Sequence, residues 1–324
     1  MKIGVSGANG FIGGHLLACL TQAGHSVRAL VRDPERMTAA ASEIVRIPSL
    51  EGNPNAADLV AALEGLEGIV HLAASVHVMD NSLGEAEYRD INIGGSCRLF
   101  EAAAAGGVQR FVYLSSAKAA GERSGAAPLT VETSPGPEDA YGRSKRDAEV
   151  ELRRLAMGSS CRLIILRPTF VYGWPAVGNF RMLLSAVLKG IPLPLGGIRN
   201  RRDMTYVGNL ADAIRQACIA PGLGEAPYFI CDHAPVSTPQ FVAHVARAFA
   251  RPARLIYMPV WMLRVCGAMT GRSAMVARLI ENFEVDGMPF RRDAGWQPPY
   301  NMPDGLAECA RLRQDSIQVE KKSA

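Results

Sequence analysis

A tyrosine and a lysine, Tyr141 and Lys145, stand four residues apart in the stretch Asp139-Ala-Tyr-Gly-Arg-Ser-Lys-Arg-Asp147. In an α-helix this spacing places both side chains on one face. An ammonium beside a phenol favours the phenolate, and one charge at ~4 Å in a medium with a dielectric constant of about 20 is worth roughly 4 kcal/mol, or about 3 pKa units. The pair predicts a tyrosine that exchanges protons near neutral pH. The alternative is a half-buried ring beside a solvated amine.

Two serines lie upstream of this pair, directly after an apolar segment that predicts a strand over 110–114. Open α/β sheets bind ligands at the carboxyl ends of their strands, which is where Ser115 and Ser116 would lie. The hydroxyl of Ser116 can donate a hydrogen bond to a substrate oxygen beside Tyr141 and stabilise a developing alkoxide. A hydrolase nucleophile is disfavoured, because no G-x-S-x-G setting with histidine and carboxylate partners surrounds it.

Glycines at intervals of three separate the first predicted strand, 1–6, from an amphipathic helix over 11–23. Such glycines permit a tight turn, close approach of the backbone to a pyrophosphate, and packing of the helix on the strand, while the helix N-terminus attracts the anion. The alternative is an ordinary tight turn. We expect a dinucleotide cradle made by Gly7, Asn9, Gly10, Phe11, Ile12 and Gly13.

The residue that would read the adenosine ribose of a dinucleotide follows the second predicted strand, 27–31. An acidic residue there binds the 2′-hydroxyl of NAD, whereas arginine accommodates the 2′-phosphate of NADP. Arg32 occupies this position, so NADP(H) is favoured, and Asp33 one place later keeps NAD(H) possible. At the end of the strand over 68–72, the small residues Ala73 and Ala74 would let the cofactor lie close, beside Leu72. The alternative is that they pack a helix on the sheet.

These residues are positioned by a regular alternation of strands and helices. Further strands are predicted over 43–47, 161–166, 204–207 and 227–231, and helices over 56–63, 87–105, 141–156, 181–188, 209–220, 239–251, 259–269 and 274–282. The alternation predicts an α/β fold, a doubly wound parallel sheet of the Rossmann type with a smaller C-terminal substrate-binding region. We expect the dinucleotide-binding domain at 1–175, re-entered at about 203–232, the substrate-binding region at 176–202 and 233–318, and a frayed tail at 319–324.

The composition bounds the class of protein. The 324 residues are 48% hydrophobic and 20% charged, which is typical of a soluble globular protein with one large or two unequal domains. A net charge of +4 does not by itself imply nucleic acid or a membrane surface as a partner. Seven cysteines without a CxxC pair indicate reduced thiols, not disulfides or a metal site.

The N-terminus lacks the pattern of an export signal, so a cytoplasmic location is expected. The most apolar late stretch, 255–269, is interrupted by Pro259, Arg264 and Gly267, which disfavours a membrane span. Peripheral membrane contact through this stretch stays open.

A basic cluster, Arg199-Asn-Arg-Arg-Asp203, precedes the strand predicted over 204–207. Guanidinium groups bind phosphate oxygens bidentately, so the cluster would suit a diphosphate if it faces a cleft. From the residues alone, a solvated loop is the more common explanation of such a run.

With these motifs in order, the chain resembles the extended short-chain dehydrogenase/reductases and, more narrowly, the nucleotide-sugar epimerase/dehydratase group. The resemblance rests on Gly7/Gly10/Gly13, His71-Leu-Ala-Ala74, Asn92, Ser116, Tyr141, Lys145, Arg167-Pro-Thr-Phe-Val-Tyr-Gly173, Arg202-Asp203 and Gly295-Trp296. It implies that Tyr141 is the general acid/base, that Lys145 bonds the nicotinamide ribose, and that Ser116 orients the sugar oxygen. It also implies a structural asparagine at Asn92, counted with the cofactor contacts, and further cofactor contacts at Ser115 and Pro168. Nucleotide-sugar contacts are implied at Lys118, Asn179 and Arg202, and a homodimer through 87–105 and 141–156.

Two departures from the group narrow the expected reaction. The segment Ser115-Ser-Ala-Lys-Ala-Ala-Gly121 lacks the Val-Tyr-Gly ending usual in UDP-galactose 4-epimerases, and Ala117-Lys118 replaces the Asp-Glu pair of dehydratases, which disfavours dehydration. Lys118 with the stretch 191–202 is most similar to bacterial reductases that complete UDP-N-acetylquinovosamine or fucosamine-type sugars for surface polysaccharides such as the O-antigen.

The resemblance therefore implies hydride transfer from NADPH to the C4 ketone of a UDP-4-keto-6-deoxy-N-acetylhexosamine. Three alternatives stay open at this point. They are a UDP-sugar 4-epimerase with tightly bound NAD, a reductase of a small apolar ketone or alcohol, and a dinucleotide-sensing scaffold without catalysis.

Overall fold

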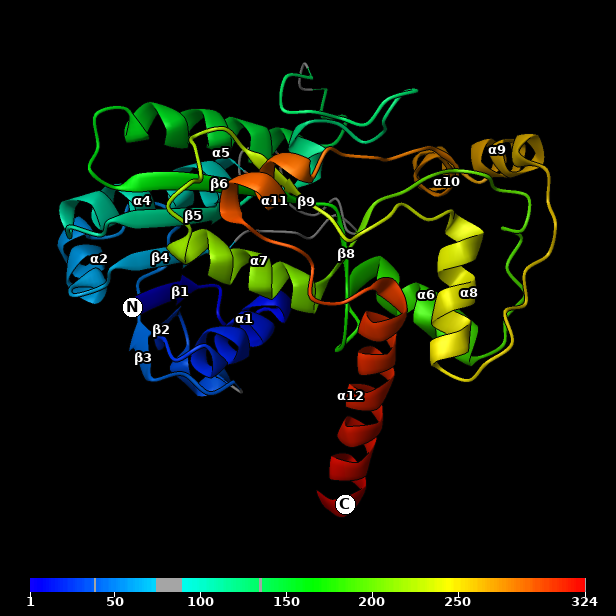
Figure 1. The fold of residues 1–324 in the computed structure, drawn as a ribbon, viewed down its shortest axis with the longest axis horizontal. Helices are drawn as coiled ribbons and strands as arrows, with labels where there is room; N and C mark the ends of the chain where they lie inside the picture. Colours follow the sequence, from blue (N-terminus) through cyan, green and yellow to red (C-terminus); the bar gives the residue numbers. More distant parts are fainter. Residues whose placement is uncertain (38, 74–88, 134–135, 324) are drawn as a thin grey trace.

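A seven-stranded sheet in which every neighbouring pair is parallel forms the centre of the fold (Figure 1). The computed structural model describes residues 1–37, 39–73, 89–133 and 136–323. The strand order is β3-β2-β1-β4-β5-β6-β9. Their bounds are β1 Lys2–Ser6, β2 Ser26–Val31, β3 Glu43–Arg46, β4 Gly68–His71, β5 Arg110–Leu114, β6 Arg162–Pro168 and β9 Tyr228–Ile230. The chain order reverses between β1 and β4, the place where such sheets bind ligands.

Helices cover both faces of this sheet because its strands bury apolar side chains on both sides. Within β2, Val27 and Val31 belong to the apolar cluster of one face and Leu30 to that of the other. The first face is covered by α1 (Phe11–Gln22) and α7 (Val207–Ile219), and the second by α2 (Ala56–Leu63), α4 (Gly95–Ala105) and α5 (Ala140–Ala156).

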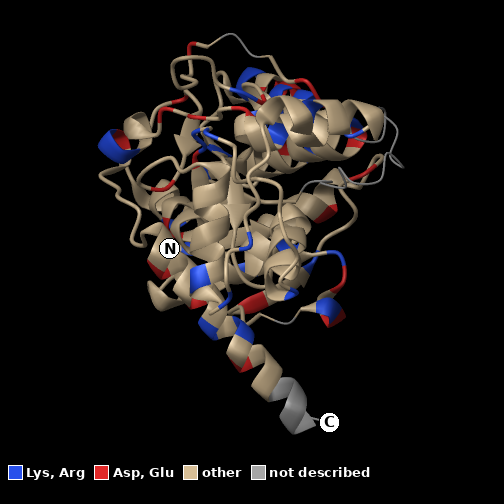
Figure 2. Ribbon diagram, turned by 90° about the vertical axis from the view of Figure 1, so that its right-hand side faces the viewer, with Lys and Arg blue, Asp and Glu red and all other residues tan. Residues whose placement is uncertain are grey.

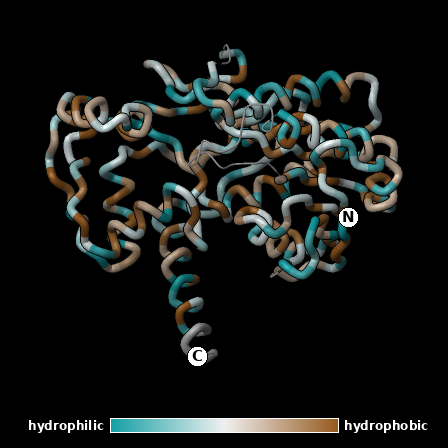
Figure 3. The backbone as a smooth tube through the Cα atoms, turned by 180° about the vertical axis from the view of Figure 1, so that it is seen from behind, coloured by the Kyte–Doolittle hydropathy of each residue, from teal (hydrophilic) through white to brown (hydrophobic). Residues whose placement is uncertain are grey.

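A second group of helices lies beside the sheet around the parallel pair β7 (Phe170–Tyr172) and β8 (Met204–Tyr206). Its core is aromatic, with Tyr172 packed on Phe180 and Phe241. The helices are α6 (Gly178–Leu188), α8 (Thr238–Ala248), α9 (Val260–Met269), α10 (Ser273–Ile280) and α12 (Met302–Ser323), while α11 (Met288–Ala294) packs against β9. Figure 3 shows this group and the sheet side by side from behind.

The predicted fold class is confirmed, and most predicted elements lie within one or two residues of the observed ones. The helix expected over 87–105 is described from Arg89, where it starts as a π-helical segment, η2 (Arg89–Gly94), before α4. The sequence analysis missed α11 and α12. Residues 319–323, expected as a tail, continue α12, whose first turns are anchored by Met302, Leu306 and Cys309 at helical spacing.

No helix within the described ranges is long and apolar enough to cross a membrane.

Candidate active site

The first turn of α5 carries the tyrosine of the predicted pair. Asp139 caps this helix by accepting a hydrogen bond from the Gly142 amide at 2.7 Å. The start of α5 packs closely against the segment that contains Lys118. A Cβ on Gly142 would lie 2.8 Å from the Lys118 carbonyl oxygen. Tyr141 is half-buried, and Lys145 lies one turn deeper and is 2% exposed.

Lys145 is held by the end of β5. Its Nζ donates to the Leu114 carbonyl at 2.8 Å and lies 4.7 Å from the ring centroid of Tyr113. Burial lowers the pKa of Lys145 to about 7, although Glu149 one turn away opposes the shift. The predicted effect of Lys145 on Tyr141 assumes a lysine that is always charged. In the folded chain that charge is itself close to titration.

Tyr113 lies beneath the lysine of the pair, with its ring against the Lys145 ammonium. Burial raises the pKa of Tyr113 well above the ordinary value, and the charges of Glu149 and Tyr141 raise it further. Tyr113 therefore stays a neutral phenol.

Ser116 lies just after the carboxyl end of β5. Its hydroxyl accepts a hydrogen bond from the Lys118 amide at 3.2 Å and caps the short helix η3 (Ala117–Ala119). Because η3 packs on the first turn of α5, Ser116 and Tyr141 are carried by adjoining segments at the carboxyl edge of the sheet. The tertiary structure thus brings together the segments that carry the predicted serine and the predicted tyrosine.

The neighbouring Ser115 turns to the other side of the strand. Its hydroxyl donates to Glu149, and Glu149 accepts two bonds from Arg167, at 2.9 Å to Nε and 2.5 Å to Nη2. The side chains of this ion pair are 4% and 7% exposed. The Ser115 hydroxyl ties α5 to β5 and β6, and a cofactor contact by this residue stays a prediction. Sequence reasoning missed Glu149, which lies one turn after Lys145.

A buried histidine links β1, β4 and α4. In the sheet register Ser6 lies opposite His71, and their side chains bond at 2.6 Å through Nδ1. His71 Nε2 bonds the Ser96 hydroxyl at 3.0 Å. Burial, followed by the charge of Lys145, lowers the pKa of His71 to about 3, so the ring is neutral. The motif around His71 was noted in the sequence, but its partners were not.

The same hydrogen-bond chain continues to the tyrosine backbone through Asn92. Ser96 donates to the Asn92 carbonyl at 2.7 Å, and the Asn92 amide donates to Ser144 at 3.0 Å. Ser144 in turn donates to the Tyr141 carbonyl at 2.8 Å. Asn92 therefore braces the first turn of α5 from within the protein, as a structural asparagine would, and its contact with a cofactor stays a prediction.

The glycine turn between β1 and α1 has the geometry of a dinucleotide cradle. Gly7 has a φ of +74°, and a Cβ on it would lie 2.8 Å from the Ala73 amide nitrogen. A Cβ on Gly13 would lie 2.4 Å from the Ala8 carbonyl oxygen. The backbone after β4 therefore lies against the turn, and the N-cap of α1, Gly10, leaves its first amides without a side-chain cap.

The other predicted members of this cradle have the accessibility that it requires. Asn9 is exposed, and Phe11, Ile12 and Leu72 are half-buried. Ala74 lies outside the described residues. The arrangement fits a dinucleotide with its pyrophosphate at α1.

Arg32 follows β2 directly and has a side chain that is 71% exposed, with Nη1 3.3 Å from Glu51. The Asp33 carboxylate is engaged locally, since it accepts a bond from the Glu35 amide at 3.3 Å and lies 3.1 Å from Arg36. Of the two charged side chains that follow β2, the arginine is therefore the more exposed.

The residues predicted to bind substrate lie in different environments, and Lys118 belongs to a cluster of charged side chains. Lys118 pairs with Asp139 and lies 3.8 Å from Glu122. Arg278 of α10 binds the same two carboxylates, at 3.3 and 3.2 Å. This charge cluster, missed by sequence reasoning, fixes α10 to the start of α5.

The arginines predicted to bind a diphosphate have different partners. Arg202 Nη1 donates to the Glu281 carbonyl at 2.9 Å, its guanidinium lies 5.6 Å from the ring centroid of Phe283, and burial lowers its pKa to about 10. Arg201 instead pairs with Glu284 at 2.8 Å on the exposed side. Asn179 is exposed in the first turn of α6, and Pro168 is buried at the end of β6.

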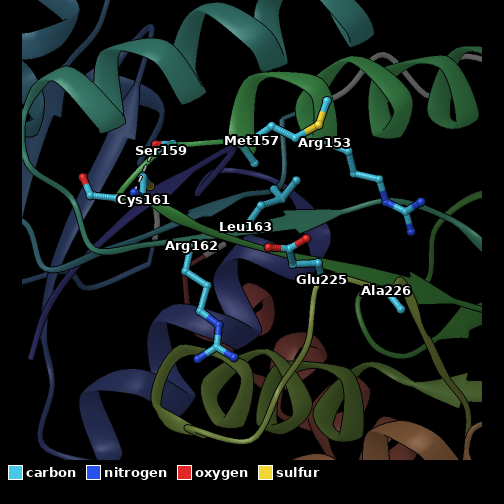
Figure 4. A pocket seen from close by; sticks show the side chains of 10 residues that line it. Arg153, Met157, Ser159, Cys161, Arg162, Leu163, Glu225 and Ala226 are labelled. Carbon is cyan, nitrogen blue, oxygen red and sulfur yellow. Dashed lines mark hydrogen bonds between the residues drawn. The ribbon is translucent and has the colours of Figure 1, made fainter.

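A pocket of about 480 Å³ lies at the opposite end of the sheet (Figure 4). It is lined by Arg153 and Met157 from the end of α5 and by Cys161 and Arg162 at the start of β6. Parallel sheets of this kind bind ligands at carboxyl ends, so this pocket is separate from the site described above. Among the described residues, no three His, Cys, Asp or Glu side chains gather as a metal site requires.

Comparison with known proteins places this geometry among related chains. A family model described as "NAD dependent epimerase/dehydratase family" matches residues 3–228. UDP-glucose 4-epimerase from Vibrio cholerae is 34% identical over 315 residues, covering 95% of this chain and 94% of that protein. A 3 beta-hydroxysteroid dehydrogenase/Delta 5-->4-isomerase from Mycobacterium tuberculosis is 29% identical over 334 residues, with coverages of 95% and 89%. MoeE5 in complex with UDP-glucose and NAD has the same fold, with a TM-score of 0.78 at 24% identity over 98% of this chain and 100% of that chain.

Proposed function

The chain belongs to the NAD dependent epimerase/dehydratase family, and on this basis we propose that it transfers hydride at C4 of a UDP-linked hexose, with Tyr141 as general acid/base. The observation that carries the proposal is that Ser116 and Tyr141 are carried by adjoining segments, η3 and the first turn of α5, at the carboxyl edge of the sheet. Lys145 lies buried below them, and the glycine cradle occupies the switch point of the same sheet.

The chain's own residues divide the work at the sugar oxygen. Ser116 donates a hydrogen bond to the C4 oxygen and orients it, and Tyr141 gives that oxygen its proton when a ketone is reduced. Lys145, with a pKa near 7, holds the nicotinamide ribose and favours the tyrosine phenolate left after the transfer. A bound nicotinamide dinucleotide supplies or accepts the hydride.

We assign the net direction to reduction of a UDP-4-keto-6-deoxy-N-acetylhexosamine by NADPH. Arg32 supports this, since a cation directly after β2 suits a 2′-phosphate and Asp33 is engaged elsewhere. The departures at Ala117 and Lys118 from the epimerase and dehydratase motifs support it as well.

A UDP-sugar 4-epimerase is the second candidate, supported by the 34% identity with the Vibrio cholerae enzyme over nearly the whole of both chains. An epimerase retains its NAD and consumes none, whereas a reductase oxidises one NADPH for each ketone reduced. The two candidates therefore share Ser116, Tyr141 and Lys145 as catalytic residues and differ in stoichiometry.

The test uses the purified protein and begins with the nucleotide that co-purifies. The reductase predicts loss of NADPH absorbance on addition of a UDP-4-keto-6-deoxy-N-acetylhexosamine. The epimerase predicts conversion of UDP-glucose or UDP-N-acetylglucosamine to the C4 epimer, read by NMR, without added cofactor. A Tyr141→Phe variant should lose activity by about 100-fold or more in either case, whereas Tyr257→Phe, an exposed tyrosine, should not.

Full activity of Tyr141→Phe would contradict the proposed role of that hydroxyl. A small apolar ketone is the third possible substrate, and Arg202→Ala separates it. A nucleotide sugar predicts a marked rise in KM for this variant, and an apolar ketone predicts almost none. Arg202→Lys keeps the charge and reports how much of the effect is bidentate binding.

A cytoplasmic homodimer through α4 and α5 completes the proposal. The outer face of α5 supports it, because Val150 is 59% exposed and Met157 beyond its end is 74% exposed. Light scattering of the wild type and of Val150→Glu tests the assembly. A wild-type monomer would exclude it.

A further inference from the structure

Helix α9 turns an apolar face to solvent. Its inner side is marked by Leu263, which is 8% exposed, and by Gly267, where a Cβ would lie 2.8 Å from Val276 of α10. On the other side Trp261, Val265 and Met269 follow one another at intervals of four, with exposures of 66%, 49% and 82%. A surface helix normally exposes charged side chains opposite its buried stripe, and α9 does not.

Side chains next to α9 enlarge this surface. Tyr257, in the loop before the helix, is 73% exposed, and Met275, in α10, is 45% exposed. We define the α9 face as Tyr257, Trp261, Met262, Val265, Met269 and Met275. Large apolar side chains gathered in exposed positions on one helix and its neighbouring segments usually mark an interaction site.

The segment that carries α9 and α10 holds charge of one sign. Residues 255–280 contain no aspartate or glutamate, and their charged side chains are Arg264, Arg272 and Arg278. All but Arg278 are exposed, and Arg278 is bound by Glu122 and Asp139. Over the whole chain 35 basic residues face 31 acidic ones, so this bias is local. Figure 2 views the molecule from the side on which α9 lies in Figure 1.

We propose that the α9 face binds the surface of an anionic phospholipid bilayer. Trp and Tyr side chains favour the boundary between headgroups and acyl chains, where an apolar helix face can be buried while arginines reach lipid phosphates. Each basic side chain near an anionic membrane adds to the attraction. The contact is peripheral, because no described helix could cross the bilayer.

Charge also distinguishes a bilayer from a second copy of the chain. A two-fold contact through the α9 face would bring the arginines of both copies together. Residues 255–280 hold no acidic side chain that could offset that repulsion. Phospholipid phosphates complement these arginines, and a bilayer imposes no shape on the apolar side chains.

The proposed contact leaves the catalytic elements in place. Arg278 fixes α10 to Asp139, which caps the helix of Tyr141. The membrane-facing segment is therefore anchored next to the site and not carried on a separate tail. The inference does not depend on which sugar the site accepts.

The test is co-sedimentation of the full chain with phosphatidylcholine vesicles that contain or lack about 40% phosphatidylglycerol. We expect binding to the anionic vesicles only, weakened by salt. Trp261→Gln/Met269→Gln and Arg264→Glu/Arg272→Glu should each lower the partition coefficient about tenfold or more. The matched controls Met288→Gln and Arg46→Glu/Arg153→Glu, equally exposed but outside the α9 face, should bind like the wild type.

A second measurement does not require a disruptive variant. Trp296 is buried and Trp174 half-buried, so a blue shift of tryptophan emission on adding anionic vesicles should come from Trp261 and vanish in Trp261→Phe, which keeps an apolar side chain and should still bind. Absence of wild-type binding at low salt would overturn the proposal, as would full binding by Trp261→Gln/Met269→Gln. A vesicle-independent dimer that this double variant dissociates would show that a second copy covers the face instead.

Discussion

Replacing Lys145 with methionine should abolish activity and yet stabilise the protein at neutral pH. Burial lowers the pKa of this lysine from 10.5 to about 7. A shift of that size means that the charged amine destabilises the folded chain by about 4–5 kcal/mol at pH 7 and below. Methionine has a similar length and carries no charge to desolvate.

Two contacts oppose this gain. The variant leaves the Leu114 carbonyl without the bond that Lys145 donates at 2.8 Å, at a cost of about 1–3 kcal/mol. It also loses the ammonium above the Tyr113 ring, which a thioether replaces in part. We therefore expect the variant to be more stable by about 1–3 kcal/mol at pH 7.

The pH dependence gives the sign of the effect. Because the folded pKa lies below the unfolded one, the unfolded chain binds more protons between about pH 7 and pH 10.5, and wild-type stability from this group rises with pH across that window. Lys145→Met lacks this rise. The two stability curves should converge with rising pH and cross at roughly pH 9, beyond which the wild type is the more stable.

Denaturant unfolding of the cofactor-free protein, followed by circular dichroism at several pH values, measures the difference. Turnover of the same samples should fall by about 100-fold or more. Lys189→Met, which removes an exposed lysine, should change neither quantity. A Lys145→Met protein less stable than the wild type at pH 7, or a difference that does not vary with pH, would refute this reasoning.

Three further changes test the site and its support. Glu149→Gln should destabilise the chain by about 3–5 kcal/mol in denaturant unfolding, because Arg167 stays buried without its partner; a loss below about 1 kcal/mol would argue against that ion pair. Gly13→Ala should abolish dinucleotide binding in calorimetry, since its Cβ would lie 2.4 Å from the Ala8 carbonyl oxygen, and unchanged affinity would exclude the cradle. Arg32→Glu should weaken NADPH binding about tenfold or more and NADH binding little, and equal losses would remove the argument for NADP(H).

Local patterns were sufficient for the sheet and for the outline of the site. Strands such as 68–72 and 110–114 are apolar on both sides and follow helices at regular intervals, which suits only a covered parallel sheet. The spacing of Tyr141 and Lys145 and the glycine turn are local too, since each depends on residues fewer than seven apart. Helix α12 was not predicted because its sequence is mostly polar and its buried apolar residues, Met302, Leu306 and Cys309, lie in its first turns.

The tertiary structure decided what each side chain faces. Ser115 and Ser116 are neighbours, but alternation along an extended chain sends one to Glu149 and leaves the other at the site. The partners of Lys118 come from Asp139 and from Glu122, which Arg278 also binds from a distant helix.

The sequence by itself determined the Tyr141–Lys145 pair, its helix and the cofactor turn, because these depend on spacing along one segment. It could not determine that Lys145 is buried against the end of β5 with a pKa near 7, or that Arg202 is bound to the Glu281 carbonyl. Burial and charge pairing arise from segments far apart in the chain, and only the packed fold brings those segments together.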